Sequence, residues 1–180
     1  MGLFSKTKTV DIFFVGSEGT DLDRGIYAFY FNVDNGEIIK KSFVKSLASP
    51  LAMNKNGRFM YLTYRNGTGR AQDGGIWQYA CMEVQLGLAA RVGNEGRTYV
   101  QTILNKDSSY AYAIDYYNGE VVSVPIKTSK IIRVSKTVKL DGHSIDPVKQ
   151  TESHPTFMTF TPDNTKLVMF YTIAGNSTRN

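Results

Sequence analysis

Cysteine and histidine are scarce in this sequence of 180 residues, which has one cysteine and two histidines. The single cysteine, Cys81, has no partner for an internal disulfide, and three such side chains are too few for a typical structural zinc site. We therefore expect neither a metal nor another cofactor.

Long apolar runs are also missing. No stretch reaches the roughly 20 consecutive apolar residues that a membrane-spanning helix needs. The first ten residues, MGLFSKTKTV, lack the apolar core of a secretion signal. We expect a cytoplasmic protein in a reducing compartment, without a membrane partner.

The composition is that of a folded domain. Hydrophobic residues make up 42% of the chain and charged residues 21%, with a net charge of +5. This balance excludes a disordered or collagen-like chain, because enough apolar surface is present to form a core.

Three segments repeat one pattern, in which a short apolar run is followed by a polar turn and a second run rich in aromatic and β-branched residues. They are residues 49–64, 98–117 and 154–172. Their turns are Asn56-Gly57, Asp107-Ser108 and Asp163-Asn164, residue types that tolerate the positive φ of tight turns. Each segment therefore predicts a β-hairpin, and the turns lie 51 and 56 residues apart.

A second pair of strands is predicted before each hairpin, in residues 24–44, 74–92 and 119–138, each of which opens near a glycine. Four short strands in about 50 residues are typical of a propeller blade. We predict an all-β fold with an N-terminal tail at 1–9 and an incomplete β-propeller at 10–180. Residues 10–17 would be the second strand of a halved first hairpin.

The length supplies about three to three and a half such units, whereas propellers have four to eight. A propeller normally closes into a ring, because closure protects the edges of its sheets. We therefore expect either a piece of a longer protein or an open assembly that self-associates through its blade edges.

Several blocks of sequence, in order, carry a family resemblance: FFVGS, GIYAFYF, SPLAMNKNGRFMYLTYR, DYYNGEVVSVPI, DPVKQTESHPT and FTPDNTKLVM. Together they resemble the amino-terminal half of the lactonase-type seven-bladed β-propellers, the family of 6-phosphogluconolactonase and muconate-lactonizing enzymes. The resemblance implies a seven-bladed fold of about twice this length. It also implies hydrolysis of a sugar-derived lactone in the pentose phosphate route.

The same resemblance implies a site near an insertion at 141–153. In its motif, Lys149 stands where the family has arginine, and Gln150 is kept. His154 matches the first histidine of a His-x-His element, and Thr156 replaces the second. Two further departures are Val100-Gln101 in place of a Cys-His pair and Asp115-Tyr116-Tyr117 in place of Asn-Tyr-Gly.

Lactone opening requires a base for the attacking water and a group that stabilises the oxyanion. His154 is the candidate base and Lys149 the candidate oxyanion or phosphate clamp. Gln150, Asp115 and His143 are candidate substrate-binding residues. Simpler interpretations remain open, in which His154 caps a turn and Lys149 is a solvated loop charge. In that case the chain is a non-catalytic propeller scaffold that binds a protein or small ligand through its loops.

Two other patterns favour structural roles. The five basic residues from Lys127 to Lys139 are spaced about three apart in a stretch that is rich in β-branched residues and lacks stacking aromatics, so we expect an outer strand pair and no nucleic-acid partner. Trp77 and Tyr79 alternate along one strand, which predicts packing between blades. Cys81 is expected to be a buried and inert thiol.

Overall fold

The computed structural model describes residues 10–17, 22, 24–45, 48–66, 73–141 and 153–171. Every regular element in these ranges is a β-strand. The described part of the chain therefore offers no helix long and apolar enough to span a membrane.

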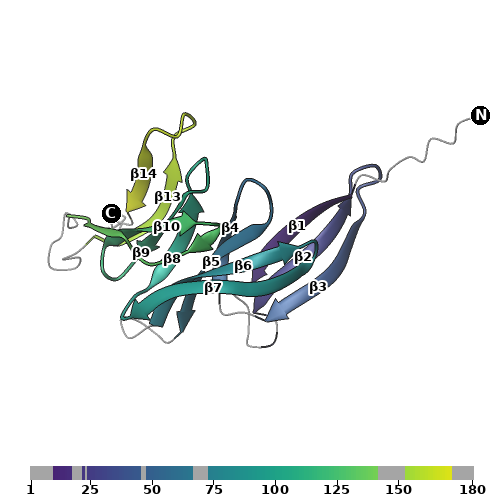
Figure 1. Cartoon of the computed structure of the whole chain (residues 1–180), viewed down its shortest axis with the longest axis horizontal. Helices are drawn as coiled ribbons and strands as arrows, with labels where there is room; N and C mark the ends of the chain where they lie inside the picture. The colour runs from purple at the N-terminus through teal and green to yellow at the C-terminus, as the bar shows by residue number, and fades with distance from the viewer. Residues whose placement is uncertain are drawn as a thin grey trace, which may run out of the picture.

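The strands form four antiparallel sheets, which we call blades 1 to 4 in chain order (Figure 1). Blade 1 comprises β1 (Val10–Ser17), β2 (Gly25–Asn32) and β3 (Ile38–Lys45). Blade 2 comprises β4 (Ala48–Met53), β5 (Phe59–Asn66), β6 (Asp73–Met82) and β7 (Gln85–Glu95). Blade 3 comprises β8 (Tyr99–Leu104), β9 (Tyr110–Asp115), β10 (Glu120–Lys127), β11 (Lys130–Ile131) and β12 (Lys136–Lys139), and blade 4 comprises β13 (Pro155–Phe160) and β14 (Leu167–Tyr171).

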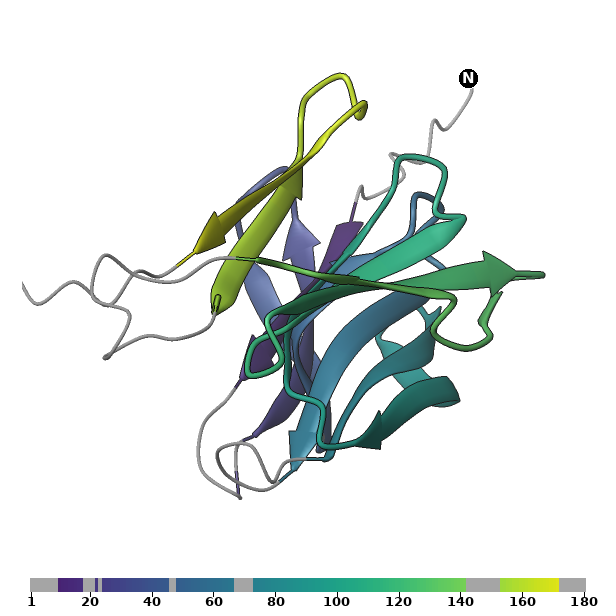
Figure 2. The same cartoon turned by 90° about the vertical axis from the view of Figure 1, so that its left-hand side faces the viewer.

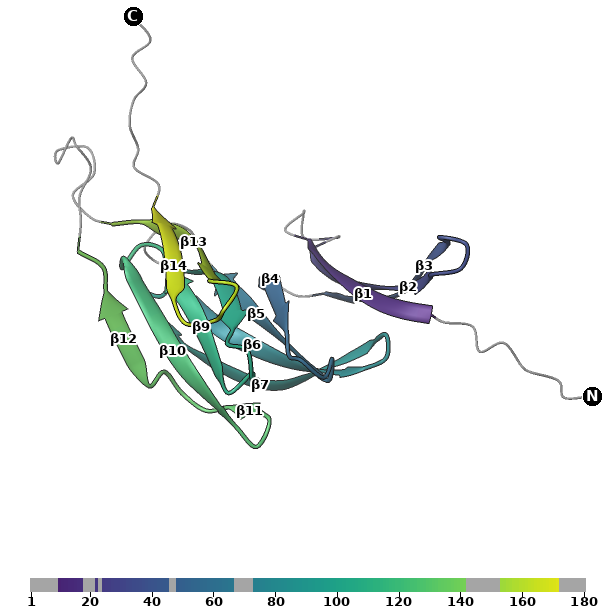
Figure 3. The ribbon, with the colours of Figure 1, turned by 90° about the horizontal axis from the view of Figure 1, so that it is seen from above.

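Sequential blades are neighbours in space. Strand β4 lies against β1 and β8, and β8 lies against β13, so the first strands of blades 2, 3 and 4 face one another on the inner side. Figure 3 shows blade 1 at one end of the row, set apart from the larger group of sheets. The architecture is the predicted partial β-propeller, which Figure 2 shows from a second side, and the described part of blade 1 has the strand order β1-β2-β3.

The three predicted hairpins are confirmed, and their turns share one geometry. Positive φ occurs at Gly57, Ser108 and Asn164, with values of 70°, 57° and 58°. The residue three positions earlier accepts a backbone hydrogen bond from each of them, at 2.9, 2.9 and 2.7 Å. In all three turns an Asn or Asp side chain also accepts from the backbone N–H two residues later. The sequence repeat is therefore a repeat of structure.

Apolar cores lie between the blades. Ile26 of blade 1 packs with Met60, Leu62 and Tyr79 of blade 2. A second cluster joins Tyr61 and Ile76 of blade 2 to residues of blade 3, and a third joins blade 3 to Met158 of blade 4. Since a sheet has two faces, blades 2 and 3 each contribute to two cores.

Two glutamines, the buried Gln78 and the half-buried Gln101, join neighbouring blades by hydrogen bonds. Gln78 in β6 is fully buried; its Nε2 donates to the Ser129 carbonyl at 2.5 Å, and its Oε1 accepts from the Ile131 N–H at 3.0 Å. In the next interface, the Met158 N–H donates to Gln101 Oε1 at 2.6 Å. The bonds to the N–H groups of Ile131 and Met158, two buried residues, satisfy donors that would otherwise lack partners.

The expected outer strand pair in the basic stretch and the expected packing of Trp77 between blades are confirmed. Strands β11 and β12 both pair with β10 on the outer side of blade 3, and the five basic side chains between Lys127 and Lys139 are exposed. Trp77 and Tyr79 contribute to the core between blades 1 and 2. Cys81 is half-buried beside them, and burial raises the pKa of its thiol to about 11.

Each inner strand has an irregular register near its start. The shift lies between Ala48 and Leu51 in β4, between Tyr99 and Gln101 in β8, and between Pro155 and Phe157 in β13. Val100 and Thr156 are therefore the unpaired residues of β-bulges. A bulge bends a strand and redirects a side chain, so the same edge of three blades is reshaped in the same way.

Candidate functional site

The candidate site lies at the end of blades 3 and 4 where the inner strands begin. Strand β9 ends there at Asp115, and the turn 116–119 leads into β10. The Tyr116 N–H donates to the Thr98 carbonyl at 2.9 Å, which fixes this turn against the start of β8. The segment before β13 reaches the same place, since the Ser153 carbonyl lies against Gly119.

Asp115 is fully buried at the base of this turn. Its Oδ2 accepts hydrogen bonds from Arg97 Nη1 at 2.9 Å and from Asn118 Nδ2 at 2.8 Å. Its Oδ1 accepts from the Thr98 N–H at 3.2 Å. Three protein groups thus donate hydrogen bonds to this carboxylate, and these bonds hold the turn 116–119 in one conformation.

Arg97 joins two carboxylates. The same Nη1 that contacts Asp115 also donates to Glu120 Oε2, and the arginine side chain is only 26% exposed. Burial acts to lower the pKa of Arg97, but the hydrogen bonds to Asp115 and Glu120 outweigh it and raise the pKa above its ordinary value. The guanidinium is therefore a fixed cation that is already neutralised by its own partners.

His154 is held by the same turn. Its Nδ1 lies 3.0 Å from the Tyr116 carbonyl oxygen, and because a carbonyl only accepts, Nδ1 carries the hydrogen. The imidazole stacks on the Tyr116 ring with the ring centroids 4.9 Å apart, and it meets the Tyr117 ring edge-on with the centroids 6.3 Å apart. In the neutral ring, Nε2 then carries the lone pair, which is the form that a general base requires.

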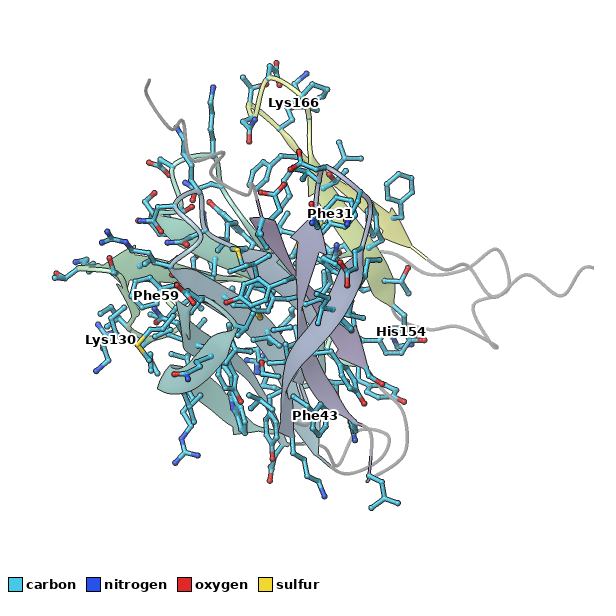
Figure 4. All side chains as sticks on the ribbon, turned by 90° about the vertical axis from the view of Figure 1, so that its right-hand side faces the viewer. Phe31, Phe43, Phe59, Lys130, His154 and Lys166 are labelled. Carbon is cyan, nitrogen blue, oxygen red and sulfur yellow. The ribbon has the colours of Figure 1, made fainter. Side chains whose placement is uncertain are left out.

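Figure 4 shows His154 at one margin of the molecule, on the side opposite Lys130. The imidazole is partly exposed, and its Nε2 makes no hydrogen bond to any residue that the structure describes. Thr156, which follows two residues later, is exposed on the bulge of β13.

The structure brings together two of the predicted site residues, His154 and Asp115, through Tyr116. His143, Lys149 and Gln150 lie outside the described residues, so their placement relative to His154 stays a prediction. Among the residues that are described, no group of three His, Cys, Asp or Glu side chains could hold a metal ion.

Sequence reasoning missed Arg97, Asn118 and Glu120 as parts of this cluster. A signal was present, because Asp115 and Glu120 flank a four-residue turn and are directly paired across β9 and β10. Two like charges at paired positions are unfavourable unless a cation lies nearby. That rule predicts a partner such as Arg97.

A family model for lactonases with seven-bladed β-propellers matches residues 12–170. The chain belongs to this lactonase family. The match covers most of the chain, so the resemblance of its sequence blocks and the propeller architecture have one explanation.

Solved structures support the fold of this lactonase-family chain. A Bacteroides fragilis protein provisionally described as a 6-phosphogluconolactonase is similar, with a TM-score of 0.74 and 21% identity over 93% of this chain and 47% of that one. The periplasmic gluconolactonase PpgL of Pseudomonas aeruginosa has a TM-score of 0.69 and 18% identity, over 91% of this chain and 47% of that one. No curated protein matches the chain. This lactonase-family chain spans about half the length of the solved structures it matches.

Proposed function

We propose that the chain binds a sugar-derived lactone of the 6-phosphogluconolactone type at the end of blades 3 and 4, and that His154 is the base for its hydrolysis. The observation that supports this most is the hydrogen bond from Nδ1 to the Tyr116 carbonyl. It selects the tautomer that carries the lone pair on Nε2, while the stacked Tyr116 ring fixes the plane of the imidazole.

In the proposed reaction, Nε2 takes a proton from water while the hydroxide adds to the lactone carbonyl carbon. The tetrahedral intermediate then expels the ring oxygen, which takes the proton back from the imidazolium, and the product is an aldonic acid. Lys149 would neutralise the oxyanion or a phosphate of the substrate, and Gln150 and His143 would bind hydroxyl groups. Asp115, buried under three donors, would act by holding the turn that carries the Tyr116 carbonyl.

Turnover is expected to be slow. Threonine at position 156 replaces the second histidine of the family motif, and a positioned acid or base contributes about 10²- to 10⁴-fold to a rate. Lysine at 149 also cannot form the bidentate hydrogen bonds that arginine makes to a carboxylate or phosphate. The second candidate function follows from the same replacement at 156, namely a propeller scaffold that binds a ligand without turning it over.

The experiment measures 6-phosphogluconolactone hydrolysis by the purified chain against the spontaneous rate. We expect a small excess over that rate, lost in His154→Ala and retained in Arg133→Gln, an exposed control on blade 3. Thr156→His should raise the rate by at least tenfold, because the bulge leaves an exposed position for the new imidazole.

An activity that survives in His154→Ala would refute the assigned base. Lactone binding without any turnover, even in Thr156→His, would favour the scaffold.

A further inference from the structure

Blade 2 carries a hollow of about 430 Å³ that is separate from the site at His154. It lies over the ends of β5 and β7 and the start of β6, and its lining includes Tyr64, Asp73, Trp77 and Arg91. The volume is in the range of small-molecule pockets.

The strand register explains why the sheet is hollow here. Tyr64 pairs with Gly75, and Gly75 pairs with Gly93, so the row beside the tyrosine has no side chains on β6 and β7. The glycines are required because the strands approach closely: a Cβ on Gly75 would lie 2.7 Å from the Val92 carbonyl. The backbone therefore forms the floor of the hollow.

Two aromatic rings form one wall. Tyr64 and Trp77 stack with centroids 4.4 Å apart and an interplanar angle of 12°. Trp77 packs partly into the core between blades 1 and 2, which holds the stack in place. Aromatic faces carry partial negative charge, and the polarised C–H groups on one face of a sugar ring are suited to pack against them.

Two charged groups of opposite sign stand at the rim. Arg91 is directly paired with Trp77, whereas Asp73 lies four residues before it, about 13 Å along the strand. Both side chains are exposed, and neither forms an ion pair with another residue in the described ranges. The rim thus offers hydrogen-bond donors at one end and acceptors at the other, with no net charge from this pair.

We infer that this hollow binds a neutral carbohydrate of one or two pyranose rings. The aromatic stack provides a surface for the ring face, and Arg91 and Asp73 provide the donors and acceptors that ring hydroxyls need. The opposite charges of the rim favour an uncharged ligand over a phosphorylated or carboxylated one. This site lies on blade 2 and does not depend on the function proposed for His154 on blade 4.

Trp77 is the single tryptophan of the chain and lines this hollow, so the tryptophan emission comes from a residue of the site. The experiment titrates the full chain with glucose, galactose, mannose and maltose and follows Trp77 emission. Mannitol, which has hydroxyls but no ring, and glucose 6-phosphate serve as ligand controls. The proteins are the wild type, Arg91→Gln, Asp73→Asn, and Arg133→Gln as the matched exposed control.

We expect a saturable change with at least one neutral sugar. Arg91→Gln and Asp73→Asn should weaken binding about tenfold, as for the loss of one hydrogen bond to a charged group. Arg133→Gln should bind as the wild type does.

Absence of a saturable change with all four sugars would overturn the inference. So would an equal response to mannitol, unchanged affinity in both rim variants, or tighter binding of glucose 6-phosphate than of glucose.

Discussion

Replacing Gln78 by leucine tests how strongly one buried amide joins blades 2 and 3. The side chain is fully buried and bonds the backbone of β11 and its preceding turn through both ends of its amide. Leucine is similar in size but can make neither bond. The variant therefore removes the hydrogen bonds while nearly conserving volume.

The cost falls mainly on Ile131. This residue is 3% exposed, so its N–H loses its acceptor where water cannot easily replace it, at a cost of about 1–3 kcal/mol. The Ser129 carbonyl belongs to an exposed residue and can bond to water, so its loss costs less, about 0.5–1 kcal/mol. Burial of the leucine side chain offsets about 1 kcal/mol. The net loss is about 2 kcal/mol, equivalent to a fall in Tm of about 4–8 °C for a chain of this size.

The assay is urea denaturation together with hydrogen exchange of the Ile131 amide. Gln85→Leu is the matched control, because Gln85 is exposed at the start of β7 and should change stability by less than about 0.5 kcal/mol. If Gln78→Leu were as stable as Gln85→Leu, or if Ile131 exchange were unchanged, the amide would not join the blades as argued.

Three further predictions concern the turn after β9 and the thiol. Asp115→Asn should lower the free energy of unfolding by about 2–3 kcal/mol, more than Glu120→Gln, because Asp115 is fully buried and asparagine has no charge to pair with Arg97. Equal effects of the two substitutions in urea denaturation would contradict this. Gly119→Ala should cost more than about 1 kcal/mol, since its φ is 58° and a Cβ would lie 2.6 Å from a backbone carbonyl, whereas Gly87→Ala meets open space and should be nearly neutral; similar Tm values for the two would refute the strain. Cys81, with its pKa raised to about 11 by burial, should react with iodoacetamide at pH 8 roughly a hundredfold more slowly in the native than in the denatured chain. Because folding favours the neutral thiol, the contribution of Cys81 to stability should be complete below pH 9 and decline as the pH rises toward 11. An alkylation rate in the native chain equal to that in the denatured chain would contradict both expectations.

The repeated hairpins were predictable from sequence because their signals are local. Asn56-Gly57, Asp107-Ser108 and Asp163-Asn164 each combine a side-chain acceptor with a residue that adopts positive φ, and all three turns form as expected. The position of the basic stretch on outer strands was predictable for a similar reason, since its many β-branched residues favour a strand and its place in the repeat is that of an outer strand pair.

Contacts between blades were not predictable in the same way. The bond from Gln78 to Ile131 spans 53 residues, and nothing in either segment alone indicates which outer strand will lie against β6. The unpaired position of Thr156 depends on a bulge between β13 and β14, which only the register reveals. At the candidate site, the histidine could be identified from a motif, but its tautomer depends on the position of the Tyr116 carbonyl in space.

The location of the apolar cores between blades determines what can unfold as a unit. Each apolar cluster in the described part of the chain is shared by two adjacent blades, so we expect the smallest cooperative element to be a pair of adjacent blades with the cluster that they share. Such a chain behaves as a linear array in which stability propagates between nearest neighbours. In the described part of the chain, blades 2 and 3 each pack against a neighbour on both faces, so we expect their amide hydrogens to exchange more slowly than those of blades 1 and 4.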